Sequence, residues 1–156
     1  MKRAEKIQVA LLKNRFKKEA GKRFDNNIID FYDDFYYVCL AGHRLHRFHK
    51  TQWFLSDCLT APGHTCANIF TDAEKDCTTE AHYTGEKRDI DGKTVVKVAT
   101  GNGYGIWLNE KYVKEYGDPA TLNYEVDENK RFSVAVILDQ NDFGMGIICP
   151  VNVTEE

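Results

Sequence analysis

Short apolar segments that end at Asp-, Asn- or Gly-rich turns recur along this chain, and they require a fold built largely on antiparallel strands. Residues 28–32 and 35–40 are rich in aromatic and branched side chains, and they flank Asp33 and Asp34. Two such runs around an Asp-Asp pair are typical of a hairpin. Residues 44–48 form a candidate third strand after it. This part of the sequence therefore predicts a three-stranded meander.

An amphipathic helix is predicted before this meander, over residues 3–20. Ala4, Ile7 and Leu11 recur at helical spacing and share one face of such a helix. Gly21 follows as a C-terminal stop. A helix with one apolar face must bury that face, and the neighbouring sheet offers the surface for it.

The last part of the chain repeats this order. Residues 94–98 and 106–108 have strand composition, and Asn109 is placed to cap a short helix over 110–116. Three further strands are separated by acidic turns and cover residues 122–126, 132–138 and 143–151. The predicted fold class is therefore α+β. A helix packs on an antiparallel sheet in each of two halves, and each half runs helix and then three strands.

Length and composition predict a single domain over residues 1–156. The chain has 156 residues, of which 42% are hydrophobic and 29% are charged, and this supplies enough apolar surface for a core. Residues 50–92 fit the pattern least, because firm apolar anchors are sparse there and Asp91-Gly92 marks a turn. We expect an irregular Cys/His-rich excursion in that part, with only short elements.

Positive charge is concentrated at the N-terminus. Residues 1–23 contain nine Lys or Arg and two acids, a net charge of +7, and the other 133 residues contain 12 bases and 22 acids, a net charge of −10. Such asymmetry suggests an anionic partner, such as DNA, a membrane surface or an acidic protein patch. A solvated helix face, neutralised by the acidic body, is the alternative. The nucleic-acid-binding residues that we predict are Lys6, Lys13, Arg15, Lys17 and Lys18.

Localisation is predicted from what the sequence lacks. No apolar run approaches the length of a membrane span, and the N-terminal segment carries no secretory signal. The odd number of cysteines, five, also favours reduced thiols. We therefore expect a cytoplasmic protein with no membrane partner.

Cysteine and histidine cluster between residues 39 and 82, which hold four of the five Cys and all five His. The best candidates for a tetrahedral zinc site are Cys58, His64, Cys66 and Cys77, with His82 as a substitute. The spacing argues against zinc, because the sequence has no Cys-x2-Cys knuckle and no His-x3-His pair. Buried cysteines that act as small apolar side chains are the alternative, and that alternative needs no cofactor.

No catalytic pattern stands out, and we expect a protein that is not an enzyme. A Cys-His nucleophile pair has no supporting spacing. Gly101, Gly103 and Gly105 do not match the dinucleotide-binding pattern, because the third glycine has the wrong offset and a strand follows it. These glycines instead predict a bend between two strands.

Residues 42–46, 109–113 and 147–153 form three short stretches that together resemble one domain of the bacterial DNA sliding clamp, the beta subunit of DNA polymerase III. Gly42-His43-Arg44-Leu45-His46 is similar to the family's Asp-Gly-x-Arg-Leu-Ala turn and strand, although Ala41 replaces the Asp. Asn109-Glu110-Lys111-Tyr112-Val113 resembles the Asn-x-x-Tyr-Leu start of the second helix in a clamp domain. The ending Ile147-Ile148-Cys149-Pro150-Val151-Asn152-Val153 resembles the terminal strand and its Met-Pro-x-Arg-Leu close.

This resemblance implies a domain with two similar β-α-β-β-β halves, whose helices face duplex DNA through Lys and Arg. A clamp ring uses six such domains, and one chain of this length supplies only one. The resemblance therefore implies either a homo-oligomer or a fold that is kept for another purpose.

The function predicted from the sequence is that of a non-enzymatic, clamp-like protein. It would bind DNA or replication-type partners through the basic N-terminal helix. The alternative is a protein–protein inhibitor or adaptor from a phage or mobile element, with an acidic interaction surface. The net charge of −10 outside the first 23 residues favours that alternative.

Overall fold

The computed structural model has an α+β fold, which confirms the predicted fold class. It describes the backbone of residues 2–19, 28–40, 44–55 and 64–153, and the side chains of these residues except 14–19. The chain forms two compact units, Met1–Ile69 and Phe70–Glu156. The single domain predicted over residues 1–156 stays a prediction. No helix in the described ranges is long and apolar enough to cross a membrane.

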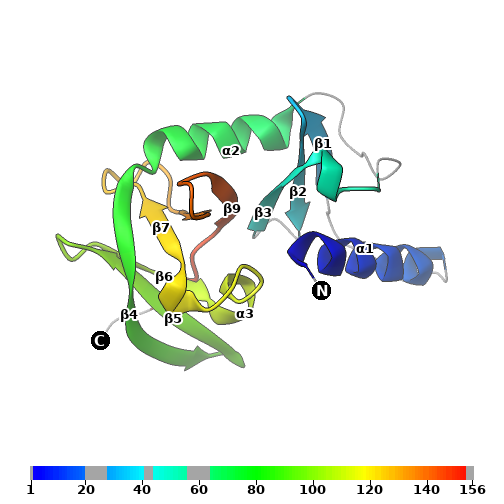
Figure 1. Ribbon diagram of the computed structural model, residues 1–156. Helices are drawn as coiled ribbons and strands as arrows, with labels where there is room; N and C mark the ends of the chain where they lie inside the picture. Colours follow the sequence, from blue (N-terminus) through cyan, green and yellow to red (C-terminus); the bar gives the residue numbers. More distant parts are fainter. Residues whose placement is uncertain (1, 20–27, 41–43, 56–63, 154–156) are drawn as a thin grey trace. The chain divides into compact units, whose positions relative to one another are not determined.

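The first unit contains the predicted helix and meander (Figure 1). Its elements are helix α1 (Arg3–Glu19), strands β1 (Ile28–Tyr32), β2 (Phe35–Leu40) and β3 (Arg44–His49), and the 3-10 helix η1 (Lys50–Gln52). The strands pair antiparallel in chain order. Asp33 and Asp34 both have positive φ, 50° and 71°, as the two central residues of a type I′ hairpin turn require. The predicted hairpin is therefore confirmed.

One face of this meander packs against α1. Ala4 and Ile7 of the helix join Val38, Phe48 and Trp53 in a single buried cluster. These helix residues belong to the apolar stripe that the sequence predicts, so the stripe faces the sheet as expected.

Residues 50–92 contain more regular structure than predicted. Helix α2 spans Thr65–Asp76, and strand β4 spans Thr79–Ile90. The helix was not predicted because most of its buried positions, Cys66, Ala67 and Ala73, carry small side chains that give a weak hydrophobic signal beside the single large one, Phe70. The strand was missed because most of its side chains are exposed and polar.

The sheet of the second unit has the strand order β9-β8-β7-β4-β5-β6, with every neighbouring pair antiparallel. The remaining elements of this unit are β5 (Lys93–Thr100), β6 (Gly105–Asn109), α3 (Glu110–Val113), the 3-10 helix η3 (Pro119–Thr121), β7 (Asn123–Val126), β8 (Ala135–Leu138) and β9 (Gly144–Ile148). The order of a helix followed by three strands holds here as well, in α3, β7, β8 and β9 (Figure 1).

One buried cluster of this unit joins strands of its sheet to α3. Strands β5 and β6 contribute Val96, Val98 and Leu108, and α3 contributes Val113. Tyr124 of β7 is fully buried among them, and its hydroxyl donates a 2.6 Å hydrogen bond to the carbonyl oxygen of Pro119. The hairpin between β4 and β5 turns at Asp91 and Gly92, both with positive φ, where the sequence predicts a turn.

Candidate functional site

The basic helix α1 is held in one rotation about its axis by a buried glutamine. The Gln8 amide nitrogen donates to the carbonyl oxygens of Ala4, at 3.1 Å, and Gln52, at 3.0 Å. The Gln8 amide oxygen accepts from the backbone N–H of Phe54 at 2.7 Å. Because Gln8 is buried and all these groups are paired, the helix is fixed against the segment that follows β3.

The outer side of α1 carries two of the predicted nucleic-acid-binding residues. Lys6 and Lys13 are both exposed, and they stand seven positions apart, about two helical turns. No carboxylate of the described residues forms an ion pair with either lysine. The side chains of the other three predicted residues, Arg15, Lys17 and Lys18, lie outside the described part of α1.

The start of α1 contacts a cluster of stacked aromatic rings through Arg3. The Arg3 Nη1 atom lies 2.8 Å from His46 Nδ1, and its guanidinium lies 4.3 Å from the centroid of the Phe48 ring. Phe48 stacks on His46 at 5.6 Å and on Trp53 at 5.4 Å between ring centroids. Since an arginine can only donate, His46 Nδ1 is the acceptor in this pair. His46 Nδ1 is therefore engaged in a structural contact with Arg3.

The predicted zinc ligands are placed at the two ends of one helix. His64 packs against the Tyr32 ring at 4.6 Å just before α2, and Cys66 is buried in its first turn. Cys77 follows the last residue of the helix and is also buried. Among the described residues, no group of three or more His, Cys, Asp or Glu is arranged to hold a metal ion. Cys58 lies outside those residues, and the zinc site stays a prediction.

The N-terminus of α2 already has an acidic partner from the sheet. The buried Asp30 carboxylate accepts hydrogen bonds from the backbone N–H groups of Cys66, at 2.8 Å, and Ala67, at 3.4 Å. A carboxylate at this position satisfies free N–H groups and complements the helix dipole. Asp30 therefore acts as a cap for the helix that carries Cys66.

Cys66 and Cys77 are expected to resist alkylation in the folded protein. Burial is the largest cause that raises the pKa of each thiol to about 12, and the nearby Asp30 and Asp127 add to the effect at Cys66 and Cys77 respectively. At pH 8, only about one thiol in ten thousand would then be ionised. Iodoacetamide labelling followed by peptide mass mapping measures this, with the same protein in guanidinium chloride as the control. Equal labelling of these thiols in both conditions would contradict the buried, apolar role.

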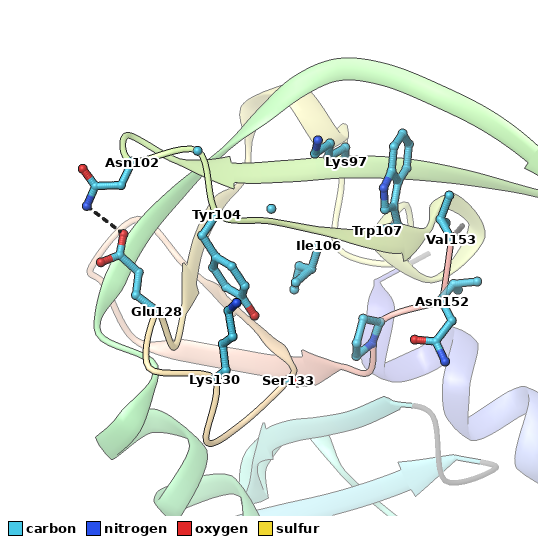
Figure 2. A pocket seen from close by; sticks show the side chains of 14 residues that line it. Lys97, Asn102, Tyr104, Ile106, Trp107, Glu128, Lys130, Ser133, Asn152 and Val153 are labelled. Carbon is cyan, nitrogen blue, oxygen red and sulfur yellow. Dashed lines mark hydrogen bonds between the residues drawn. The ribbon is translucent and has the colours of Figure 1, made fainter. Parts of the chain in front are cut away.

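A groove runs beside strand β6 in the second unit, and we call it the β6 groove. It has a volume of about 900 Å³. Its lining residues are Lys97, Glu128, Lys130, Ser133 and those at positions 102–107 and 150–153. Figure 2 shows Tyr104 and Lys130 pointing toward each other at one end of the groove. The Lys130 Nζ atom lies 5.6 Å from the centroid of the Tyr104 ring.

Residues 150–153 line the other end of the β6 groove. The backbone N–H of Val151 donates a 2.8 Å hydrogen bond to the carbonyl oxygen of Trp107. Lys97 lies opposite Trp107 on β5, with its Nζ atom 5.7 Å from the Trp107 ring centroid. Among the described residues that line the groove, Glu128 is the one carboxylate, and it accepts a 3.2 Å hydrogen bond from the Asn102 side chain.

The residues of the β6 groove were not predicted as a site from the sequence. Gly101, Gly103 and Gly105 were predicted as a bend, and the bend is confirmed, since Gly103 has φ of 88° and its N–H donates to the carbonyl oxygen of Thr100. Lys97 and Lys130 are 33 positions apart and carry no shared pattern. The pairing of β5 with β6 and the loop between β7 and β8 bring them to one groove.

Comparison with protein-family models, with curated proteins and with solved structures found no match to this chain.

Proposed function

We propose that this protein is a non-enzymatic, clamp-like binder of DNA or of replication-type partners, and that it acts through the outer side of α1. The observation that supports the proposal is the fixed orientation of the helix. Within the first unit, Ala4, Ile7 and Gln8 of α1 are buried. Lys6 and Lys13 of the same helix are exposed. A row of exposed lysines on a rigid helix suits the regular spacing of phosphates in duplex DNA.

The expected binding is independent of base sequence and sensitive to salt. Lysines that contact phosphates release condensed counterions, so the logarithm of the affinity falls linearly with the logarithm of the salt concentration. Each phosphate contact contributes about 0.9 to that slope. The same helix also carries Glu5, which is exposed, so the surface is a stripe of charge and not a uniformly basic face.

Reversing the charge of both exposed lysines tests the proposal. The variant Lys6→Glu with Lys13→Glu is expected to bind duplex DNA at least about tenfold more weakly, with a salt slope smaller by about 2. Fluorescence anisotropy with a labelled duplex of about 20 base pairs, at several salt concentrations, measures both quantities. The matched control is Lys75→Glu with Lys93→Glu, which changes the net charge equally at two exposed lysines outside α1.

Two outcomes would count against the proposal. If the α1 variant retained the wild-type affinity and slope, the helix would not be the binding surface. If the wild-type protein did not bind DNA at low salt, the acidic-surface inhibitor would become the better hypothesis. The second unit supports that alternative, since residues 70–156 hold 17 acids against nine Lys or Arg, a net charge of −8.

A further inference from the structure

We infer that the β6 groove is a docking site for an extended, acidic peptide segment of a partner protein, which adds to β6 as a further strand. This inference concerns a different unit and a different class of ligand from the DNA surface on α1, and it does not depend on that proposal. It is carried by the direction of the backbone groups of β6 and by the two lysines of the groove.

Strand β6 offers one side of its backbone to the groove. Among the described strands, β6 pairs with β5 alone. In an antiparallel pair, the N–H and C=O groups of alternate residues point toward the partner strand and away from it. The Trp107 carbonyl points away from β5, because it accepts from Val151. The N–H and C=O of Gly105, two residues earlier, therefore point away from β5 too, into the groove that Gly105 lines.

No backbone hydrogen bond from the described residues reaches Gly105 on that side. The same edge already accepts another backbone segment two residues further along. The N–H of Val151 donates to the carbonyl oxygen of Trp107 there. Edge strands in proteins are commonly protected by charged residues or proline, and the sequence of β6, Gly-Ile-Trp-Leu-Asn, contains neither. An edge of this kind is suited to strand addition.

The charge of the groove favours an acidic peptide. The Lys97 and Lys130 Nζ atoms lie 5.7 Å and 5.6 Å from aromatic ring centroids, and Glu128, the one acid among the described lining residues, accepts a hydrogen bond from Asn102. Figure 2 shows Lys130 beside Tyr104 and Lys97 on the Trp107 side of β6. Consecutive residues of an extended strand point to opposite faces. Two adjacent acidic residues of a docked peptide could therefore reach one lysine each.

A short peptide is the probe for this site. The groove runs along residues 103–107, which end with the first three residues of β6, so a peptide of about six residues covers this length at about 3.3 Å per residue. The probe has blocked ends and two central glutamates flanked by valine and threonine, and a second peptide has lysines in place of the glutamates. Titration of the ¹⁵N-labelled full chain, followed by amide chemical shifts, is expected to move Gly105 and the Trp107 indole N–H. The acidic peptide is expected to bind at least tenfold more tightly than the lysine peptide.

Substitutions of Gly105 separate the backbone contact from packing effects. A proline at an outward-facing position of an edge strand removes a donor without breaking the ladder with the inner strand. Gly105→Pro is therefore expected to reduce binding at least tenfold. Gly105→Ala retains the N–H but crowds the Lys97 stem, whose Cε atom lies 2.6 Å from where the new Cβ would be. A several-fold smaller loss is expected for the alanine variant.

The charge contact has its own test, which also covers the case in which Gly105→Pro fails to fold. Lys97→Glu with Lys130→Glu is expected to reverse the preference, so that the lysine peptide binds more tightly. The control Lys75→Glu with Lys93→Glu is expected to leave the preference unchanged. The inference would be overturned by equal affinity for the two peptides, by shifts confined to residues outside the groove, or by a single-stranded oligonucleotide that displaces the acidic peptide at lower concentration.

Discussion

Replacing Phe48 by alanine is expected to lower the free energy of unfolding by about 3–5 kcal/mol. The side chain is only 1% exposed, and it is stacked between His46 and Trp53 with the Arg3 guanidinium over its ring. Its removal leaves a cavity and also breaks the aromatic stack. Together, the cavity and the broken stack cost more free energy than the loss of buried apolar area alone, because the surrounding rings cannot collapse freely into the space.

Urea unfolding measures this loss when it is followed by the fluorescence of Trp53. The chain has two tryptophans, and a Trp107→Phe background leaves Trp53, which contacts Phe48, as the only reporter. The matched control in the same unit is Phe54→Ala, because Phe54 is 77% exposed. This control is expected to change stability by less than about 0.5 kcal/mol. A Phe48→Ala variant no less stable than the control would contradict the described packing.

The same substitution bears on the binding proposal. Phe48 belongs to the buried cluster on which Ala4 and Ile7 of α1 rest. Loosening that cluster is expected to weaken DNA binding even though no charge is removed. The lysines of a mobile helix lose more conformational entropy when they align with phosphates. A charge-reversal variant differs in a way that can be measured, since it reduces the salt slope, whereas Phe48→Ala preserves it.

The elements that the sequence predicts well are those with a strong local signal. The hairpin of residues 28–40 has branched and aromatic strands around Asp33-Asp34, and those two residues adopt the positive φ that the turn needs. Helix α1 has a clear apolar stripe, and Asn109 caps the short helix α3 through the N–H of Lys111. In each case, propensity, pattern and turn chemistry agree with one another.

Helix α2 shows where local reasoning fails. Cys66, Ala67, Phe70, Ala73 and Cys77 are all buried, and their spacing of one, three and four positions is that of a helix. Small side chains weaken the apolar signal, and a cysteine fits the pattern of a metal ligand as well as that of a core residue. Cysteine is among the residue types that are most often buried, so the plainer interpretation of the pattern was available in the sequence.

The two candidate surfaces differ in how far the sequence could predict them. Lys6 and Lys13 follow from helix periodicity, which places residues seven apart on one side. The β6 groove depends on the register that sets Lys97 opposite Trp107 and on the loop that carries Lys130 to Tyr104. Register between strands and loop conformation are tertiary properties, and no short segment of this sequence encodes them.

Replacing Asp127 by alanine is expected to lower the free energy of unfolding by about 2–4 kcal/mol and to disable the β6 groove. The carboxylate is 2% exposed and accepts three backbone hydrogen bonds from the loop that follows it. One oxygen accepts from Asn129 N–H at 2.9 Å, and the other accepts from Arg131 at 3.0 Å and Phe132 at 3.2 Å. Charged acceptors make the stronger hydrogen bonds, and the loss of this one leaves three donors without their partner.

The same loop positions Lys130 for the groove. Lys130 has a φ of 59°, a conformation that is unfavourable for a residue with a side chain. The hydrogen bonds to Asp127 hold its neighbours on both sides, so they stabilise this conformation. Without the carboxylate, the loop is expected to relax, and Lys130 then leaves the Tyr104 ring. The variant should therefore lose the preference for the acidic peptide as well as stability.

Asp139→Ala is the matched control for this experiment. Asp139 makes the same kind of turn between β8 and β9, where one carboxylate oxygen accepts from Asn141 at 2.8 Å and Phe143 at 3.0 Å. That turn is more exposed and does not line the β6 groove, so water can replace the lost acceptor. Its loss is expected to cost about 0.5–2 kcal/mol and to leave peptide preference unchanged.

Denaturant unfolding and peptide titration of both variants separate the two effects. If Asp127→Ala kept the wild-type preference, Lys130 would be held by contacts other than this loop, and the loop would not determine the specificity of the groove.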